Sequence, residues 1–462
     1  MKGLSAIILA AGLGTRMKSG LAKVLHPLAG RPMLLYMVDN VLSLKPEKVV
    51  AVVGHQADSV KEILPPGVAA ALQKEQKGTA HAAMTGLKGL AGLDGTLLLV
   101  SGDTPLLSTE TLKRLLSEHK KKKADISILT ATLDDPTGYG RIIRDGERSV
   151  ARIVEQKDAD DGEKAVCEIN SGTYCFQMKA LKVALKEVKA ENAQKEFYLT
   201  DAIAITANKG GKVIGVKAER PHEALGINSR VELARAEKII RRQINEGLMA
   251  SGVTIPDPDN TYIEASVKVG RDCVIYPGNH IYGGTVIGDG CTLMPGNIIT
   301  GSEIKAGVKV KGYCVVEDSV VEGGAAIGPF SHIRPGSKVG PDARVGNFVE
   351  LKKAALGRGA KASHLSYLGD SDIGADVNVG AGTITCNYDG FSKFRTVIED
   401  GAFIGSDTQL VAPVRVGRGA VIAAGTTVTK DVPADALAIS RTAQTNHEGW
   451  AKKNREIKAK KK

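Results

Sequence analysis

A glycine-rich turn near the start of the chain could bind phosphate. Gly12 and Gly14 follow an apolar run and stand just before Arg16, with Lys23 seven residues further on. Such a turn lets backbone N–H groups approach a phosphate closely, and the two basic side chains would stabilise the charge that builds up on a reacting phosphorus centre. The turn is not a Walker A motif, and Met17 stands where the dinucleotide-binding fingerprint needs a third glycine. Taken alone, it could equally be a structural turn.

A second group of polar side chains surrounds a break in the second half of the chain. Between Gly380 and Ile404, a polar and aromatic insertion containing Asn387 and Tyr388 interrupts a regular pattern, and His364 lies shortly before it. Loops of this kind usually carry function. A lone histidine would more often be a structural corner residue. Beside this insertion, His364 becomes a candidate general base, because imidazole titrates near neutral pH.

The pattern that the insertion interrupts is an aliphatic residue at every sixth position. Neither a helix nor an ordinary strand has this period, which is typical of a left-handed parallel β-helix whose aliphatic side chains point into a triangular prism. Glycine repeatedly follows the aliphatic residue, where a corner needs a backbone without a Cβ. The aliphatic positions are Val269, Ile275, Ile281, Ile287, Leu293, Ile299, Ile327, Ile333, Val339, Val345, Ile404, Leu410, Val416, Ile422 and Val428.

The first half alternates short apolar runs with helical patterns. The runs over 6–10, 49–53 and 96–100 predict buried strands, and residues 32–44 predict a helix. This alternation is typical of a mainly parallel sheet covered on both faces, as in Rossmann-like α/β domains.

A helix is expected to link the two halves. Ser229 and Glu232 form an S-x-x-E capping box ahead of a periodic apolar segment. The β-helix that follows would have about ten coils. We expect an α/β domain over 1–228, a linker helix over 229–250, the β-helix over 251–446 and a basic tail over 447–462.

The composition fits a globular protein with several cores. Of 462 residues, 43% are hydrophobic and only 4% aromatic, which suits a narrow prism filled by small aliphatic side chains. The apolar run 5–11 is too short for a signal peptide. No CxxC pair or zinc-ligand spacing occurs, which favours reduced thiols in the cytoplasm. The cysteines are Cys167, Cys175, Cys273, Cys291, Cys314 and Cys386.

The net charge of +11 does not by itself indicate nucleic-acid binding. Seven Lys or Arg residues against two Glu fall within 447–462, a polar segment expected to be solvated and flexible. No aromatic stacking residues alternate with the basic ones. We therefore expect small-molecule partners and neither nucleic acid nor membrane.

The glycine turn resembles the signature of the sugar-phosphate nucleotidyltransferase family. That signature is a G-x-G-T-R-M loop, here residues 12–17, with a downstream lysine, here Lys23. Ala22 departs from the proline usual in the family, and Ser101 from the tyrosine of some relatives. The resemblance implies that Lys23 and Arg16 stabilise the departing pyrophosphate. It implies nucleotide and sugar binding by Leu9, Ala10, Ala11, Gly12, Lys23, Gln73, Gly78, Thr79, Ser101, Gly102, Asp103, Gly140, Glu155, Asn170 and Asn228.

The chemistry of three of these residues supports the resemblance. The amide of Gln73 can donate and accept together, which suits one edge of uracil. Asp103 follows a predicted strand, at the end where open α/β sheets bind ligands, and it could hold Mg²⁺ together with Asn228. Asp103 could instead be a helix cap, because Thr104 and Pro105 read as a helix start.

Longer strings in both halves resemble one narrower family, the bacterial bifunctional N-acetylglucosamine-1-phosphate uridyltransferase/glucosamine-1-phosphate acetyltransferases. They include 345–350, 367–370, 380–390 and 405–413, and the match extends from about residue 4 to 450. The resemblance implies acetyl transfer from acetyl-CoA to glucosamine 1-phosphate. Uridylyl transfer from UTP to N-acetylglucosamine 1-phosphate would follow, supplying UDP-N-acetylglucosamine for peptidoglycan and lipopolysaccharide. The resemblance also implies that the protein is a homotrimer in the cytoplasm.

The same resemblance assigns residues in the second half. His364 would be the general base that deprotonates the amino sugar, and Glu350 could orient it. Ser363 stands where some relatives have glycine. Arg334 and Lys352 would bind the dianionic phosphate of the amino sugar, and Lys393 is a weaker candidate for the same role. The resemblance assigns Arg334, Lys352, Tyr367 and Asn378 to glucosamine 1-phosphate, and Ala381, Asn387, Tyr388, Ser406, Ala424 and Arg441 to acetyl-CoA.

Two other functions remain open at this point. One is a single-function nucleotidyltransferase with a regulatory or trimerising β-helix, which the insertion and His364 argue against. The other is a trimeric scaffold without turnover, which would leave the combination of Lys23, Asp103 and Asn228 unexplained.

Overall fold

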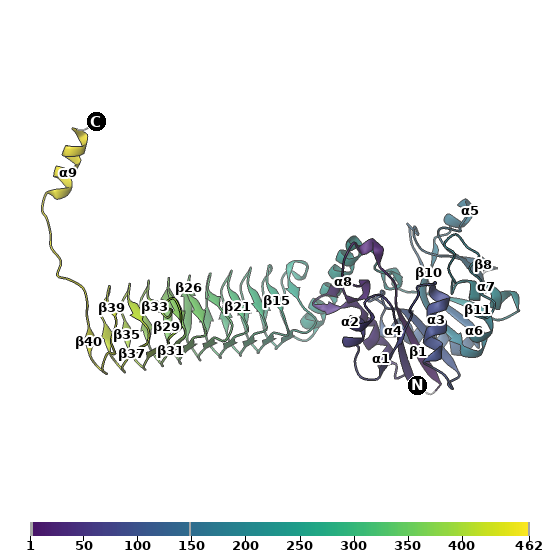
Figure 1. Ribbon diagram of the computed structural model, residues 1–462, viewed down its shortest axis with the longest axis horizontal. Helices are drawn as coiled ribbons and strands as arrows, with labels where there is room; N and C mark the ends of the chain where they lie inside the picture. Colours follow the sequence, from purple (N-terminus) through teal and green to yellow (C-terminus); the bar gives the residue numbers. More distant parts are fainter. Residues whose placement is uncertain (1–2, 147–148, 461–462) are drawn as a thin grey trace. The chain divides into compact units, whose positions relative to one another are not determined.

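The computed structural model describes residues 3–146 and 149–460 and divides the chain into two compact units (Figure 1). The first unit spans Met1–Arg241 and the second Arg242–Lys462. The division falls inside helix α8 (Arg230–Ala250). The expected capping box begins this helix, because Ser229 Oγ accepts from the Glu232 N–H at 3.2 Å and the Glu232 carboxylate accepts from the Ser229 N–H at 2.8 Å.

A nine-stranded mixed sheet forms the first unit, in the order β5-β4-β1-β6-β10-β7-β11-β9-β8. The strands β5, β4, β1 and β6 are parallel, and β10 is antiparallel to β6 and β7. The strands are β1 (Leu4–Ala10), β4 (Lys48–Val53), β5 (Val68–Leu72), β6 (Thr96–Ser101), β7 (Ile126–Thr132), β8 (Arg141–Asp145), β9 (Ser149–Val154), β10 (Glu168–Gln177) and β11 (Val213–Lys217).

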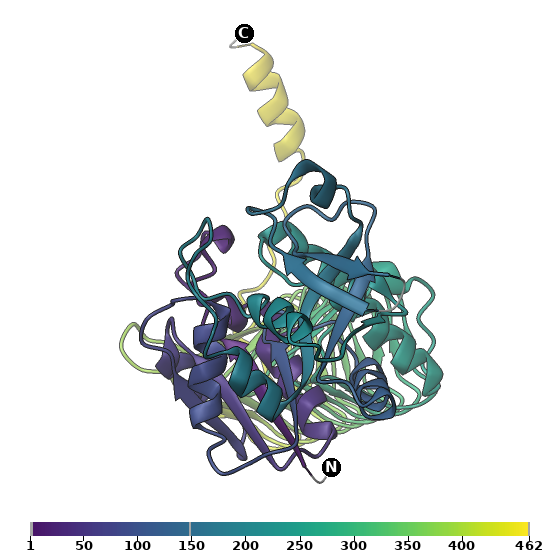
Figure 2. The same ribbon diagram turned by 90° about the vertical axis from the view of Figure 1, so that its right-hand side faces the viewer.

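Helices cover both faces of this sheet (Figure 2). Alternate side chains of β1 enter different cores: Ala6 and Ile8 pack with α1 and α4, whereas Ile7 packs with α3. A strand buried on both faces must be apolar throughout, which is why this segment reads as one continuous hydrophobic run. The helices are α1 (Met33–Ser43), α2 (Ala57–Glu62), α3 (Thr79–Lys88), α4 (Thr109–Lys122), α5 (Asp161–Lys164), α6 (Met178–Ala184) and α7 (Asp201–Asn208).

The second unit is the expected left-handed parallel β-helix, with three parallel sheets of 10, 9 and 10 strands. Nearly every position of the six-residue repeat is buried in one continuous core, and Val269 in an early coil is partly buried. Close packing of successive coils explains the glycines: a Cβ on Gly346 would lie 1.9 Å from the Ser363 carbonyl oxygen. Asn245 of α8 donates to the carbonyls of Pro258 and Thr261 and so joins the helix to the first coil.

The coils contribute strands to each of the three sheets of the prism, and the strands that carry expected site residues or lie near them in the chain are the following. The first sheet includes β24 (His332–Ile333), β27 (Glu350–Lys352), β30 (Tyr367–Gly369) and β33 (Ile384–Cys386). The second sheet includes β34 (Thr396–Ile398), which is the first strand after the insertion. The third includes β26 (Arg344–Asn347), β29 (Lys361–His364), β32 (Asn378–Val379), β35 (Phe403–Ile404) and β38 (Val421–Ile422).

The basic tail, expected as a flexible segment, contains helix α9 (Trp450–Ala459), whose described side chains are almost all exposed. Within 3–146 and 149–460, no helix combines the length and apolar composition that crossing a membrane requires.

Candidate active sites

A cavity of about 420 Å³ lies at the carboxyl ends of β1 and β6, where open α/β sheets bind ligands. Twelve of the residues expected at the nucleotide site line it. They are Leu9, Ala10, Ala11, Gly12, Arg16, Lys23, Gln73, Gly78, Thr79, Ser101, Asp103 and Asn228.

The glycine turn is shaped to lie against Lys23. Gly14 has a left-handed φ of 63°, and a Cβ at this position would lie 2.6 Å from the Lys23 Cβ. Met17, which replaces the third glycine of a dinucleotide fingerprint, is 1% exposed and anchors the turn in the core. The turn is therefore built to bring Arg16 and Lys23 to the cavity.

Lys23 holds the two expected metal ligands together. Its ammonium forms an ion pair with Asp103 and donates to Asn228 Oδ1 at 3.1 Å, and the Lys23 and Asp103 side chains are 14% and 18% exposed. Two oxygen atoms that contact one ammonium are close enough to share a cation. This arrangement fits Mg²⁺, which typically takes one or two protein oxygens and completes its coordination with phosphate oxygens and water.

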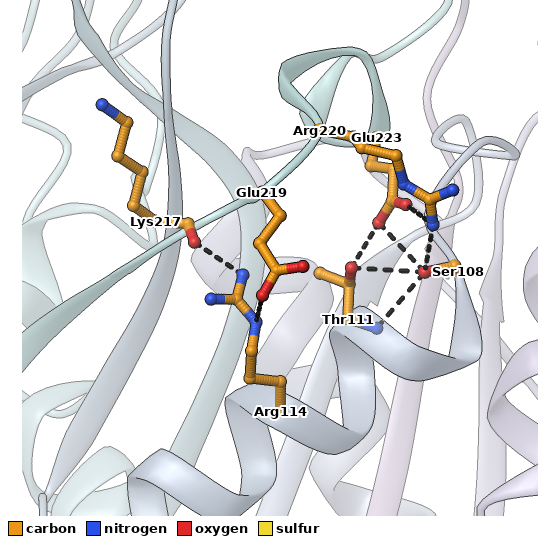
Figure 3. Close-up of polar contacts among 7 residues, drawn as sticks. All are labelled: Ser108, Thr111, Arg114, Lys217, Glu219, Arg220 and Glu223. Atoms are coloured by element: carbon orange, nitrogen blue, oxygen red, sulfur yellow. Dashed lines mark hydrogen bonds and ion pairs between the residues drawn. The ribbon is translucent and has the colours of Figure 1, made fainter.

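The segment before Asn228 is fixed to the start of α4 through Arg220 and Glu223 (Figure 3). The carboxylate of Glu223, 1% exposed, accepts hydrogen bonds from Thr111 and from Ser108 Oγ at 3.0 Å, and it forms an ion pair with Arg220. A buried carboxylate needs several such partners to offset its desolvation. Four residues later, the Ile227 N–H donates to the Asp103 carbonyl at 2.8 Å, which sets Asn228 beside Asp103.

The residues expected around the sugar lie next to the cavity and do not line it. Asn170 Nδ2 donates to the Tyr174 hydroxyl at 2.7 Å, and the Asn170 N–H donates to the Gly140 carbonyl at 2.9 Å. Glu155 accepts from Thr200 Oγ1 at 3.2 Å, and burial raises the pKa of its carboxyl group.

Chain neighbours of this sugar-side cluster lie beside the cavity lining at two places. A Cβ on Gly172, between Asn170 and Tyr174 in the sequence, would lie 3.1 Å from the cavity-lining Ser101 Oγ. The Leu199 N–H, one residue before Thr200, donates to the cavity-lining Thr79 Oγ1. Gly102, which was also expected at the nucleotide site, is not among the cavity-lining residues. A Cβ on this residue would lie 2.8 Å from Leu34 Cδ1.

The second unit has its candidate base at a corner of the prism. His364 Nδ1 lies 2.8 Å from Asn347 Oδ1, one coil away in register. The expected partner, Glu350, instead accepts from Arg334 at 2.8 Å. The reason is the strand register: Asn347 and His364 share one sheet of the prism, whereas Glu350 lies in the next sheet.

His364 belongs to a row of residues that runs along the prism axis. The pairs Ala362–Val379, Val379–Ile404 and Ile404–Ile422 are in register. Two residues further along the chain from each of these positions, successive coils meet the same corner about 4.8 Å apart. The row, called here the corner row, consists of Asn347, His364, Ala381, Ser406 and Ala424, and Arg441 donates to the Ala424 carbonyl.

The residues expected to bind sugar phosphate form a cationic group on the neighbouring face. Arg334 and Lys352 lie there, and proximity to Lys393 of the insertion, followed by burial and Arg334, lowers the pKa of Lys352. Tyr367 and Asn387 meet at Gly369, where a Cβ would lie 2.5 Å from the tyrosine hydroxyl oxygen and 2.8 Å from Asn387 Nδ2. Two lysines and an arginine, of which Arg334 is paired with Glu350, favour an anion here.

Asn378 lies outside the sheet of this cationic group, whereas Tyr388 is joined to the group by an antiparallel β-bridge with Lys393. Asn378 is in the same sheet as His364. Tyr388 lies in the insertion, 59% exposed, with its hydroxyl donating to the Gly390 carbonyl at 2.6 Å.

Known proteins match both units. Residues 6–173 match the MobA-like NTP transferase domain, and residues 266–301 and 395–430 match the bacterial transferase hexapeptide (six repeats). Proteins named bifunctional protein GlmU align over almost the whole chain. Those of Trichlorobacter lovleyi and Pelobacter propionicus are 51% and 50% identical, covering 98% and 97% of this chain and 99% and 98% of the relatives. The chain belongs to the GlmU family.

Family membership confirms the prediction of a bifunctional transferase. A nucleotidyltransferase unit and a hexapeptide acyltransferase unit occur in one GlmU-family chain, so the chain is an enzyme with nucleotide and acyl substrates. Of the described residues, no group of three or more His, Cys, Asp or Glu is placed so that it could hold a metal ion.

Sequence reasoning missed several cavity residues of this GlmU-family chain. Leu13, Gly14 and Thr15 were not missed, because they belong to the 12–17 loop that the sequence indicated, and Gln76 begins the 76–79 turn that resembles the family. No sequence pattern marked Glu196 as a site residue, because only the fold of the segment after α6 brings this residue to the cavity. The missed lining residues are Val24, Ala82 and Glu196.

Proposed function

We propose that the β-helix acetylates glucosamine 1-phosphate with acetyl-CoA and that the first unit then transfers uridylyl from UTP to the N-acetylglucosamine 1-phosphate. The observation that carries this proposal is the combination, in one chain, of the Lys23, Asp103 and Asn228 constellation with the corner row through His364. We also propose domain boundaries at 228, 250 and 446.

Uridylyl transfer needs charge stabilisation and no covalent intermediate. A phosphate oxygen of the sugar attacks the α-phosphorus of UTP in line, and pyrophosphate leaves. Arg16 and Lys23 lie at the glycine turn, where their positive charges stabilise the departing group. Asp103 and Asn228 would hold Mg²⁺, which neutralises phosphate charge when bound. Lys23 would then leave these oxygens for the phosphates.

Acetyl transfer needs a base for the ammonium of the amino sugar. Because the side-chain Oδ1 of Asn347 faces His364 Nδ1 and can only accept, the proton of a neutral imidazole lies on Nδ1. Nε2 then keeps its lone pair. Nε2 would remove a proton from the ammonium, and the free amine would attack the thioester carbonyl. The corner row, which extends from His364 through successive coils, suits an extended ligand such as acetyl-CoA.

One incubation tests both activities. Purified protein is given glucosamine 1-phosphate, acetyl-CoA, UTP and Mg²⁺, and free thiol, pyrophosphate and the mass of the sugar product are followed. UDP-N-acetylglucosamine with both by-products is the expected result. Pyrophosphate formed only when N-acetylglucosamine 1-phosphate is supplied ready-made would leave a single-function uridyltransferase.

The proposed assembly is a homotrimer in the cytoplasm. Three exposed aromatic rings, Tyr313, Phe330 and Phe348, stack along one corner of the prism with centroids 5.5 and 5.4 Å apart. Leu365, also exposed, follows His364 and continues this ridge in the next coil. An exposed apolar ridge beside the candidate base supports packing against a second copy of the chain. Six free cysteines support a reducing compartment.

Replacing Phe348 by aspartate is expected to shift the mass by light scattering from three chains toward one and to lower acetyl transfer, because a charge would be buried in the interface. Val286 offers a matched control, since it is 41% exposed on another face, and Val286→Asp should remain trimeric. A wild-type protein with the mass of one chain would contradict the trimer.

A further inference from the structure

The amide of Gln73 is held from behind by two groups of the protein. Gln73 lines the nucleotide cavity and is 4% exposed. Its Nε2 lies 3.3 Å from the Gly78 carbonyl oxygen and 3.1 Å from His81 Nδ1. His81 is in the first turn of α3 and does not line the cavity.

The Gly78 carbonyl determines which way the amide faces. A carbonyl oxygen only accepts, so the NH₂ group of Gln73 must point toward it, because the reversed amide would bring two acceptors together. The carbonyl itself is fixed, since it also accepts from the Ala82 N–H at 3.1 Å. Gly78 also lies close to Phe197, whose carbonyl oxygen would be 2.5 Å from a Cβ at this position.

His81 uses the remaining hydrogen of the same NH₂ group. For that contact, Nδ1 must accept, which places the proton of a neutral imidazole on Nε2. Both hydrogens of Gln73 Nε2 then have partners. Within the described part of the chain, no hydrogen bond to Gln73 Oε1 is found, so the amide offers the cavity an acceptor only.

We infer that His81 is a specificity-determining positioning residue, which together with the Gly78 carbonyl keeps Gln73 as an acceptor for a ring N–H of the incoming base. Uracil has such a donor at N3, whereas cytosine has a lone pair there, which would face the Gln73 oxygen and be repelled. The sequence suggested that Gln73 both donates and accepts, and the two protein partners reduce this to acceptance. The inference rests on the proposed uridylyl transfer and adds the means of base selection.

The test compares substrates that differ at N3, using the full-length enzyme with N-acetylglucosamine 1-phosphate and Mg²⁺. The kcat/KM values for UTP, CTP and 3-methyluridine triphosphate are measured by pyrophosphate release. The wild type is expected to favour UTP at least tenfold over both analogues, because a site built around a hydrogen bond rejects a ligand that lacks the donor. Equal use of UTP and 3-methyluridine triphosphate would overturn the inference without any variant.

Two variants isolate His81. His81→Phe removes the acceptor, and the UTP to CTP ratio of kcat/KM should fall about tenfold, mainly through the KM for UTP. His81→Asn can return an acceptor near the position of Nδ1 and should restore most of the ratio. An unchanged ratio in His81→Phe would refute the role of His81 and leave uridylyl transfer intact, whereas no pyrophosphate release by the wild type would refute the proposed function itself.

Discussion

Replacing His364 by alanine is expected to lower acetyl transfer by about a hundredfold or more while uridylyl transfer persists. The amine of the sugar arrives protonated at neutral pH and cannot attack the thioester until a base removes a proton. His364 is the imidazole beside the insertion, and Asn347 Oδ1 holds its Nδ1 at 2.8 Å, which leaves Nε2 to act. Thiol release from acetyl-CoA measures acetyl transfer, and pyrophosphate release from UTP measures the other reaction.

A second histidine of the prism provides the control for this variant. His280 stacks on Tyr262, with ring centroids 4.4 Å apart, and lies outside the corner row. His280→Ala should retain acetyl transfer. Asn347→Ala should give an intermediate loss, because the imidazole would keep a basic nitrogen but lose the contact that orients it. Retained acetylation by His364→Ala would remove this residue from the mechanism.

Lys23→Ala is expected to cut uridylyl transfer at least tenfold and to spare acetyl transfer. Loss of one charged donor to a transition state typically costs about 3 kcal/mol of barrier, or roughly a hundredfold in rate. The structure gives Lys23 a further contact, because its ammonium lies on the oxygens of Asp103 and Asn228. The rate of pyrophosphate release, compared with thiol release by the same preparation, measures the effect.

A neighbouring lysine separates a specific role from a general charge effect. Lys18 follows the glycine turn with an exposed side chain and does not line the cavity. Lys18→Ala removes the same charge and should change uridylyl transfer little. Unchanged transfer kinetics in Lys23→Ala would refute the proposed role of Lys23. Binding of Mn²⁺ to the variant, followed by electron paramagnetic resonance, would then report on Asp103 and Asn228 alone.

The fold was predictable because its signals are local and repeated. In the β-helix, the aliphatic residue that enters the prism, such as Ile281 or Ile404, is set by a six-residue count that any coil reveals. In the first unit, the runs that became β1, β4 and β6 are buried on both faces and therefore continuously apolar. The residues of the glycine turn could also be found from sequence, because neighbours in the chain form that part of the cavity.

The contacts between distant side chains were decided by tertiary structure. Lys23 is 80 residues from Asp103 and 205 from Asn228, and only the sheet and the segment fixed by Glu223 bring them together. The register of the coils gives His364 the partner Asn347 in place of Glu350.

The insertion interrupts the spacing of the corner row, because 25 residues separate Ala381 from Ser406 whereas 17 separate His364 from Ala381. A sequence by itself determines which side chains enter a core, because burial follows short-range periodicity. Which outward side chains meet depends on loop lengths and coil register, and these exist only in the folded chain.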